Sequence, residues 1–322
     1  MRAAVVCAAG QPPALTELVV PTPLPSENLI RVSAAAVSHL AKARASGGHY
    51  TDSGQFPFGV GIDGVGELED GSRVYFAMPR APYGSMADYA VVDERFCVPM
   101  PAGLDGATAA AIANPCMSSW AALTERARFK PGETVLINGA TGTSGRLAIQ
   151  VARKLGAGRI VATGRNAEAL EEVRLLGADV TIQFGEDING VRHRLMEEFA
   201  HGVDVVLDYL WGPSAENLLL AAAAAGRDAV PMRFVQIGSI SAADITLPAA
   251  VMRANAIELM GSGGGSVSLP RLVAVIEDVL RAAAAEGWQI AFKPMPFSTF
   301  NEAWQQDNSA CRTVFTMTAQ EA

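Results

Sequence analysis

The chain has 322 residues, of which half are hydrophobic and 18% are charged, and its formal net charge is −8. This composition is typical of a globular protein of about two domains with a sizeable core. The acidic balance argues against nucleic acid or an anionic membrane surface as a partner. No apolar run reaches the roughly 18 residues that a transmembrane helix needs, and residues 1–6 are expected to form a strand rather than a signal peptide.

The cysteines are few and widely separated. They stand at positions 7, 97, 116 and 311, and no Cys-x-x-Cys pair occurs. The spacing therefore predicts neither a redox motif nor a structural zinc lobe. Scattered thiols are typical of a reducing compartment, so we expect a cytoplasmic protein.

The first hundred residues are rich in glycine, proline and short apolar runs, with turn signals every eight to twelve residues or so. This pattern predicts a β-rich domain, and a compact barrel is the natural form. Residues 104–124 are rich in alanine and are expected to be helical. The Asn114-Pro115 pair is expected to interrupt that helix, because proline has no N–H to donate.

From Gly132 onward, strand and helix patterns alternate, which predicts a parallel sheet with helices on both faces. The later tail, residues 288–317, returns to short strand-like runs after an amphipathic helix that begins near Pro270, and we expect it to rejoin the N-terminal domain. The expected parallel strands are 134–138, 159–163, 180–183, 203–207, 233–238 and 257–261, and the helices between them are 144–155, 167–176, 188–200 and 215–225.

Three glycines separate the first of these strands from its helix. A strand, a glycine turn and a helix form the opening of a dinucleotide-binding unit, in which the helix N-terminus faces the pyrophosphate. The spacing is GxxGxxG, and a tight turn without a ligand would have the same pattern. A phosphate-binding loop of the nucleotide triphosphatases is excluded, because no Gly-Lys-Ser/Thr follows. The expected cradle is Gly139, Ala140, Thr141, Gly142, Thr143, Ser144 and Gly145.

The second strand ends in Gly164, Arg165 and Asn166. A site that prefers NAD usually has an acidic residue at this place, about 20 residues after the glycines. A guanidinium suits a 2′-phosphate instead, so NADPH is the favoured cofactor. The alternative is that Arg165 is an ordinary surface arginine. At the end of a later strand, the backbone of Ile237, Gly238 and Ser239 is expected to contact the same cofactor.

Nearly the whole chain resembles the medium-chain dehydrogenase/reductase superfamily. The resemblance is carried by Lys130-Pro131-Gly132-Glu133 running into the glycine turn, by Gly61-Ile62-Asp63-Gly64-Val65-Gly66, and by Val203-Asp204-Val205-Val206-Leu207-Asp208. The most similar branch is that of the zinc-independent, zeta-crystallin-like quinone oxidoreductases. The resemblance implies an α/β protein with a GroES-like β-barrel catalytic domain (residues 1–122 and 266–322) and a Rossmann NADPH-binding domain with a doubly wound parallel sheet (residues 123–265), and an active site between them.

The zinc-dependent relatives carry a His-Glu pair and an upstream cysteine. Here the matching positions hold Ile62-Asp63 and Ser38, so no metal is expected. The mechanism of the short-chain reductases is excluded as well, because no tyrosine is followed by a lysine four residues later.

The resemblance also implies candidate catalytic residues. Ser38 occupies a position where relatives have a polar group that faces the substrate, Tyr50 matches an aromatic residue beside the nicotinamide, and Ser118 matches a site near the nicotinamide. Each of them could instead be an ordinary loop or helix residue.

The sequence thus predicts an NADPH-dependent, zinc-independent reductase that transfers a hydride to a small-molecule quinone or another activated carbonyl or alkene. An enoyl-thioester reductase and an NADPH-binding protein without turnover are the alternatives. The apolar strand 257–260 could form an open sheet edge that pairs with a second copy, so we expect a homodimer.

Overall fold

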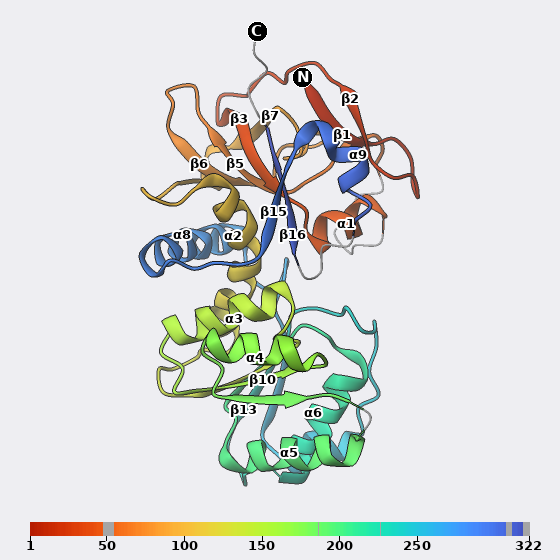
Figure 1. Ribbon diagram of the computed structural model, residues 1–322, viewed down its shortest axis with the longest axis vertical. Helices are drawn as coiled ribbons and strands as arrows, with labels where there is room; N and C mark the ends of the chain where they lie inside the picture. The colour runs from red at the N-terminus through yellow and green to blue at the C-terminus, as the bar shows by residue number, and fades with distance from the viewer. Residues whose placement is uncertain (48–54, 186, 226, 307–310, 318–322) are drawn as a thin grey trace. The chain divides into compact units, whose positions relative to one another are not determined.

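The computed structural model describes residues 1–47, 55–185, 187–225, 227–306 and 311–317. The chain divides into two compact units (Figure 1). Unit 1 comprises Met1–Asn114 and Leu269–Ala322, and unit 2 comprises Pro115–Ser268. The changes of unit at residues 114 and 268 differ from the sequence-based boundaries at 122 and 265. The first lies within a continuous helix, α2 (Gly106–Ala121).

Unit 1 is a β domain with two sheets. One has the strand order β2-β1-β4. The other has the order β15-β16-β3-β5-β6-β8, with β7 also paired to β3. The strands are β1 (Arg2–Val6), β2 (Ala14–Glu17), β3 (Glu27–Ala36), β4 (Phe58–Gly59), β5 (Asp63–Glu67), β6 (Arg73–Ala77), β7 (Tyr89–Asp93), β8 (Cys97–Pro99), β15 (Phe292–Pro296) and β16 (Arg312–Thr316). The helical segments are α1 (His39–Ala45), η1 (Glu94–Phe96), α8 (Leu269–Glu286), η3 (Phe297–Thr299) and α9 (Phe300–Ala303).

The C-terminal strands complete the larger sheet of unit 1. β16 pairs antiparallel with β3 through Val314 and Ala36, and β15 pairs parallel with β16. The ring centroid of Phe315 lies 5.0 Å from that of Phe300 and 6.0 Å from that of Phe297. All three rings are buried. These three rings belong to the same hydrophobic core as residues of β1 and β3, so the aromatic cluster anchors the C-terminal segment to the N-terminal part of unit 1.

Unit 2 is a six-stranded, all-parallel sheet in the order β11-β10-β9-β12-β13-β14. This doubly wound order confirms the sequence-based expectation. The strands are β9 (Thr134–Asn138), β10 (Arg159–Gly164), β11 (Val180–Gln183), β12 (Val205–Asp208), β13 (Met232–Gln236) and β14 (Ile257–Gly261). The helical segments are η2 (Ala122–Arg126), α3 (Thr143–Lys154), α4 (Ala167–Leu175), α5 (Ile188–His201), α6 (Gly212–Ala225) and α7 (Ala249–Ala254).

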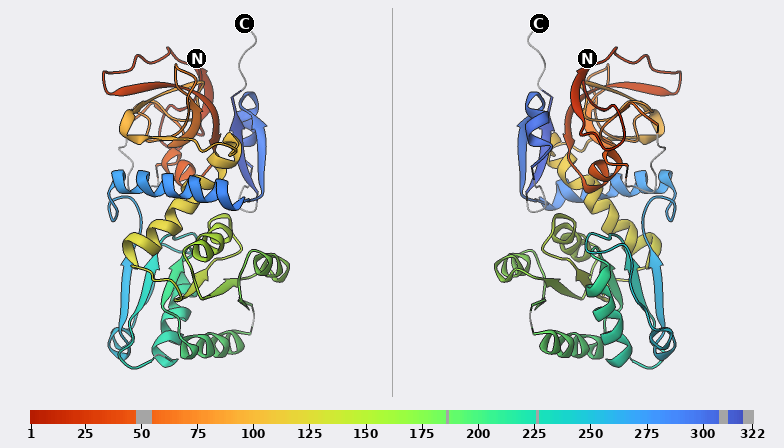
Figure 2. Two further views of the ribbon diagram at one scale, coloured as in Figure 1. Left: turned by 90° about the vertical axis from the view of Figure 1, so that its left-hand side faces the viewer. Right: turned by 90° about the vertical axis from the view of Figure 1, so that its right-hand side faces the viewer.

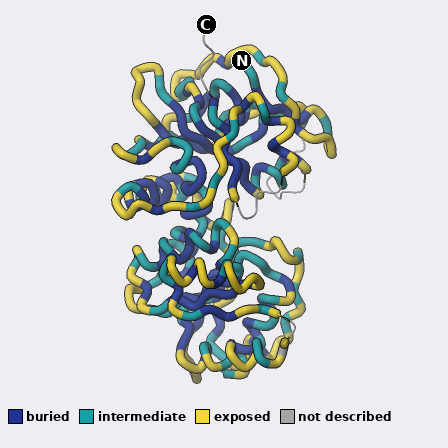
Figure 3. Tube along the Cα trace, viewed as in Figure 1, coloured by how far each residue is buried: buried dark blue, intermediate teal, exposed yellow. Residues whose placement is uncertain are grey.

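Helices cover both faces of this sheet. Leu195 of α5 and Leu218 of α6 pack with Leu136 and Val206 of the strands in one buried cluster, and α3 and α4 lie on the opposite side (Figures 1 and 2). The central strands are buried along their length, whereas α4 and α5 keep exposed residues on their outer sides (Figure 3). Strands that are buried on both faces explain the continuous apolar runs in the sequence.

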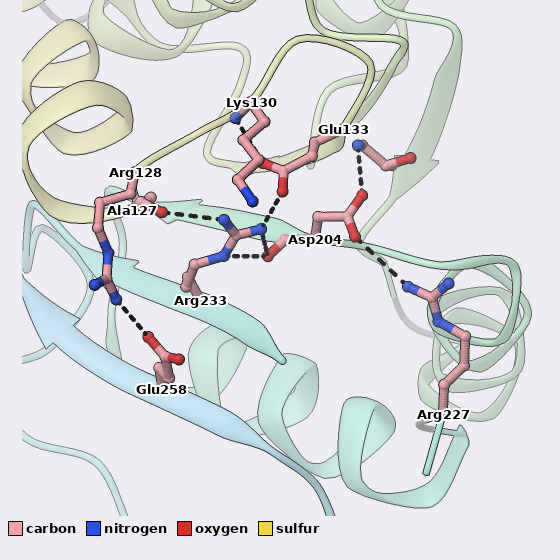
Figure 4. Close-up of polar contacts among 9 residues, drawn as sticks. Ala127, Arg128, Lys130, Glu133, Asp204, Arg227, Arg233 and Glu258 are labelled. Carbon is pink, nitrogen blue, oxygen red and sulfur yellow. Dashed lines mark hydrogen bonds and ion pairs between the residues drawn. The ribbon is translucent and has the colours of Figure 1, made fainter. Parts of the chain in front are cut away.

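Charged side chains hold the amino ends of the strands in unit 2 (Figure 4). Nη2 of Arg233 donates to Glu133 Oε1 at 2.9 Å, and its Nη1 donates to the carbonyl of Ala127 at 3.1 Å. Arg227 lies 3.6 Å from Asp204. The glycine turn follows the carboxyl end of β9, so these contacts occupy the opposite end of the sheet from the candidate site.

The proline within α2 does not end the helix. The sequence predicts an interruption at Asn114-Pro115, but α2 runs from Gly106 to Ala121 with Pro115 inside it. That expectation was wrong. The hydrogen-bond donor that replaces the missing N–H of Pro115 comes from Arg312 of β16. Within the residues that the structure describes, no helix combines the length and the apolar character needed to cross a membrane.

The aromatic cluster gives a test of unit 1. Phe315→Ala should lower the free energy of unfolding by about 3–5 kcal/mol, because it removes a buried ring and leaves a cavity. Urea denaturation followed by circular dichroism measures the change. Val19, whose exposed fraction is 87%, provides the control, and Val19→Ala should change the free energy of unfolding by less than about 0.5 kcal/mol. Equal losses in the two variants would contradict the role of the cluster.

Candidate functional site

The turn between β9 and α3 adopts a shape that suits glycine. Gly139 follows the last residue of β9 and has a φ of +88°, in the left-handed region that L side chains rarely adopt. A Cβ atom there would also lie 3.0 Å from the side chain of Leu210. Gly142 has extended backbone and caps the N-terminus of α3. The turn therefore reverses the chain within four residues of the strand end.

Gly145 allows α3 to pack directly on this turn. A Cβ atom at residue 145 would lie 2.3 Å from the carbonyl oxygen of Gly139 and 2.5 Å from Cα of Ala140, and both are backbone atoms. At Gly142 the nearest atom to an added Cβ would be 3.6 Å away. The two glycines therefore have different roles. The close packing of α3 on the turn requires glycine at position 145, whereas glycine at position 142 leaves the outer side of the turn without a side chain.

Arg146 supports the turn from the helix. Its Nε donates to the carbonyl of Thr141 at 2.9 Å, and its Nη2 lies 2.5 Å from Glu172 of the segment that forms α4. Thr143 and Ser144 form the first turn of α3. The first turn of any α-helix carries N–H groups without helical acceptors and the positive end of the helix dipole. The arrangement can therefore receive an anion.

The end of β10 lies against the same turn. The amide of Ala140 donates to the carbonyl of Thr163 at 2.9 Å, and a Cβ atom on Gly164 would lie 2.6 Å from Cγ2 of Thr141. Arg165, the next residue, is exposed. Across the ranges that the structure describes, its guanidinium has no hydrogen-bonded or ion-paired partner, and only its carbonyl is engaged, by Gln183 Nε2 at 3.0 Å. Arg165 therefore directly follows the residue that contacts the glycine turn.

Asn166 has a local structural role. Its Oδ1 accepts from the amide of Ala169 at 2.8 Å, which caps the N-terminus of α4. The sequence-based hypothesis assigns Asn166 to the cofactor. The capping bond engages its side-chain oxygen, and its carbonyl accepts from the amide of Leu170 at 3.1 Å, so the side-chain amide nitrogen and the backbone N–H are the groups it could offer to a ligand.

Residues 237–239 follow β13 and lie beside the end of β12. The amides of Ile237 and Gly238 both donate to the carbonyl of Asp208, at 2.7 and 3.1 Å. A Cβ atom on Gly238 would lie 2.7 Å from the carbonyl of Tyr209. Ser239 is exposed. The loops after β9, β10, β12 and β13 are thus connected through direct contacts at the carboxyl ends of the strands, where doubly wound sheets bind ligands.

A buried polar network connects these strand ends, and the sequence analysis did not identify it. Nδ2 of Asn138 donates to Asp208 Oδ1 at 2.8 Å, and Oγ1 of Thr163 donates to Asn138 Oδ1 at 2.8 Å. The three side chains are buried. Burial raises the pKa of Asp208, while hydrogen bonds from the Leu210 amide and from Asn138 act in the other direction. The signal available in the sequence was a polar residue at the end of each apolar strand, in VLIN and VVLD.

Ser118 lies in α2, near the loop that follows β12. Its Oγ donates to the carbonyl of Pro115 at 2.7 Å. Burial raises the pKa of Tyr209, and the neighbouring hydroxyls of Ser118 and Ser119 act in the other direction. Within the described part of the chain, Tyr209 Oη has no hydrogen-bond partner of normal geometry. The structure therefore brings Ser118 to the loop that also contacts Gly139 and Gly238.

The remaining candidates belong to unit 1. Ser38 is buried at the end of β3, and its Oγ accepts from the amide of Ala41 at 3.0 Å as the N-cap of α1. Tyr50 lies outside the described residues. Among the residues with described positions, no group of three or more His, Cys, Asp or Glu side chains could hold a metal ion.

Comparisons with known proteins add to this geometry. Residues 145–281 match the family model described as zinc-binding dehydrogenase. The chain is 30% identical, over 96% of its length and 98% of the relative's, to the protein named "Probable NADPH-dependent quinone reductase tdiC" of Emericella nidulans. The chain belongs to the medium-chain dehydrogenase/reductase superfamily, in its zinc-independent quinone reductase branch.

Two further members of the superfamily support this placement. The quinone oxidoreductase of Lama guanicoe is 29% identical, with 70% of this chain and 71% of that protein covered. The quinone oxidoreductase of Thermus thermophilus, solved also in complex with NADPH, has a TM-score of 0.78 at 26% identity, with 98% of this chain and 100% of that chain covered. The fold described above is therefore that of the medium-chain dehydrogenases/reductases.

The two glycines of the turn should respond differently to alanine. Gly145→Ala should lower the free energy of unfolding by about 3 kcal/mol, because its Cβ would overlap backbone atoms that cannot rotate away. Gly142→Ala, the matched control, should cost less than about 1 kcal/mol, because a Cβ there makes only an ordinary van der Waals contact, 3.6 Å from the carbonyl oxygen of Gly139. Urea unfolding of both variants measures the difference. A larger loss for Gly142→Ala would show that the close approach of α3 is not what the fold requires.

Proposed function

We propose that this protein is an NADPH-dependent reductase that transfers a hydride to a quinone, or to another activated carbonyl or alkene, without a metal ion. The observation that carries the proposal is the arrangement of Arg165 beside the glycine turn at the centre of a doubly wound sheet. The likeness of the chain to quinone reductases over nearly its full length supports the same function.

The residues of unit 2 fit a dinucleotide phosphate. The turn from Gly139 to Gly145 has no side chain at residue 142, so a pyrophosphate can approach the main chain and the N-terminus of α3. Thr143 and Ser144 would hold the phosphates from the first turn of the helix. Backbone groups of residues 237–239 would hold the cofactor from the neighbouring strand end.

Arg165 would select NADPH over NADH. Its exposed guanidinium follows the second strand, where an NAD-preferring protein has an acidic residue. A guanidinium can bind a phosphate with two parallel, charge-assisted hydrogen bonds. Gly164 beside it contacts Thr141, so the 2′-phosphate and the pyrophosphate would lie on adjoining loops.

NADPH supplies the hydride when it is bound, and the side chains of the chain orient the acceptor and polarise its oxygen. Ser38 is suited to the second task, because its Oγ accepts from Ala41 and the hydroxyl proton is not used in the cap. The proton remains available to a substrate oxygen on which negative charge develops. By resemblance to the superfamily, Ser118 and Tyr50 are the further candidates for contact with the nicotinamide.

We also infer a cytoplasmic homodimer. β14 is the last strand in the order of the parallel sheet, and its Glu258 and Leu259 are exposed, so this edge can pair with a second copy. The four cysteines are free thiols, which is typical of a reducing compartment.

The cofactor assignment is tested with Arg165→Ala. The dissociation constant for NADPH should rise about 10- to 100-fold, because a charge-assisted contact with phosphate contributes about 1.5–3 kcal/mol. The constant for NADH should change less than about threefold. Arg128→Ala is the matched control, since Arg128 is an exposed arginine of the same unit near the amino ends of the strands. Equal losses for both cofactors would overturn the assignment.

The reaction is tested by following the absorbance of NADPH with a panel of quinones, enones and enoyl thioesters. We expect the highest kcat/KM with a quinone, and a much lower value when NADH replaces NADPH. A clear preference for an enoyl thioester would identify an enoyl-thioester reductase. Tight NADPH binding without turnover of any acceptor would identify a binding protein and refute the enzymatic proposal.

A further inference from the structure

Helix α2 contains a buried carbonyl that the helix itself cannot satisfy. An α-helix bonds the N–H of each residue to the carbonyl four residues earlier, and proline has no N–H. Pro115 therefore leaves the carbonyl of Ala111 without its helical donor. Ala111 is fully buried, so water does not replace the missing bond. Continuation of α2 to Ala121 requires a donor from elsewhere.

Arg312 supplies this donor from β16. Its Nη1 donates to the carbonyl of Ala111 at 3.0 Å, and its Nε donates to the carbonyl of Val37 at 3.2 Å. The amide of Val37 in turn donates to the carbonyl of Thr313 at 2.9 Å. One guanidinium thus connects the start of β16, the interior of α2 and the residue that precedes Ser38. All of these residues belong to unit 1.

The charge of Arg312 acts on a buried carboxyl group of the same unit. Arg312 is only 5% exposed, and a buried guanidinium keeps its proton, so a counter-charge is needed. Asp63 of β5 is 3% exposed and accepts from Tyr75 Oη at 2.7 Å. Burial raises the pKa of Asp63, whereas the charge of Arg312 and the bond from Tyr75 lower it. Burial and Asp63 raise the pKa of Tyr75, which keeps that phenol protonated.

We propose that Arg312 is a positioning residue, which fixes the turn that presents Ser38 and at the same time allows α2 to continue through Pro115. Its bond to the carbonyl of Val37 sets the peptide plane immediately before Ser38. The bond to Ala111 replaces the one that Pro115 removes. The part that concerns Ser38 rests on the proposed function, whereas the part that concerns α2 does not.

Arg312→Lys tests the two tasks together. Lysine keeps the positive charge, but its single nitrogen cannot reproduce the fork that reaches both carbonyls. Hydrogen–deuterium exchange should become about tenfold faster in two segments, residues 38–45 of the turn and α1, and residues 109–113 of α2. Arg95→Lys is the control, because Arg95 is an exposed arginine paired with Asp93. It should leave both segments unchanged.

Pro115→Ala restores an N–H opposite the carbonyl of Ala111. In the Arg312→Lys/Pro115→Ala double variant, exchange in residues 109–113 should return toward the original rate, while exchange in residues 38–45 should stay fast. No change in either segment for Arg312→Lys, or recovery of both segments together, would overturn the proposal. These readouts need no activity, so failure of the proposed function leaves them interpretable.

Whether Arg312 acts through Ser38 is tested kinetically, by making Arg312→Lys both in the original protein and in the Ser38→Ala variant. Arg312→Lys should lower kcat for the quinone about tenfold with an unchanged dissociation constant for NADPH. In the Ser38→Ala background, the same substitution should have less than a twofold further effect, because Arg312 acts through Ser38. Equal kcat losses in both backgrounds would show that Arg312 does not act through Ser38.

Discussion

The candidate site of unit 2 depends on one close contact, the approach of α3 to the turn that precedes it. A Cβ atom at residue 145 would lie 2.3 Å from the carbonyl of Gly139. Because residue 145 has no side chain, the first turn of α3 packs directly against the backbone of the turn that follows β9. The loops after β10 and β12 then reach the same turn, through Gly164 against Thr141 and through Leu210 against Gly139. Backbone packing, more than any single side chain, brings the candidate cofactor residues together.

Both units place polar side chains in their buried cores. In unit 2, Asn138 bonds to both Thr163 and Asp208 at the centre of the sheet. In unit 1, Arg312 donates to two backbone carbonyls, and its charge lowers the pKa of the buried Asp63 against the effect of burial. An unpaired group at either place would cost about 1–3 kcal/mol, and more if it were charged. Each network therefore fixes its backbone in one arrangement.

The sequence predicted the parallel sheet well, because strands buried on both faces leave uninterrupted apolar runs and glycines mark the turn. It failed at Pro115, where local reasoning predicts a broken helix. The missing donor comes from Arg312, which lies about two hundred residues later in the chain, and no local pattern reveals such a partner. The capping roles of Ser38 and Asn166 were also missed, because the sequence-based hypothesis assigned both residues to the ligand.

Unit 2 positions its candidate residues by close backbone packing, whereas unit 1 positions Ser38 by hydrogen bonds from a buried arginine. The turn around Gly142 has no side chain at residue 142, so in the proposed function it presents backbone donors to a dinucleotide phosphate, and the proposed preference for NADPH rests on Arg165 of the adjoining loop. The turn before Ser38 is defined by a buried charge with directional bonds. Directional bonds fix an angle, which packing alone does not. A hydroxyl that must point at a developing oxyanion needs that angular control, whereas a cradle for a flexible phosphate does not.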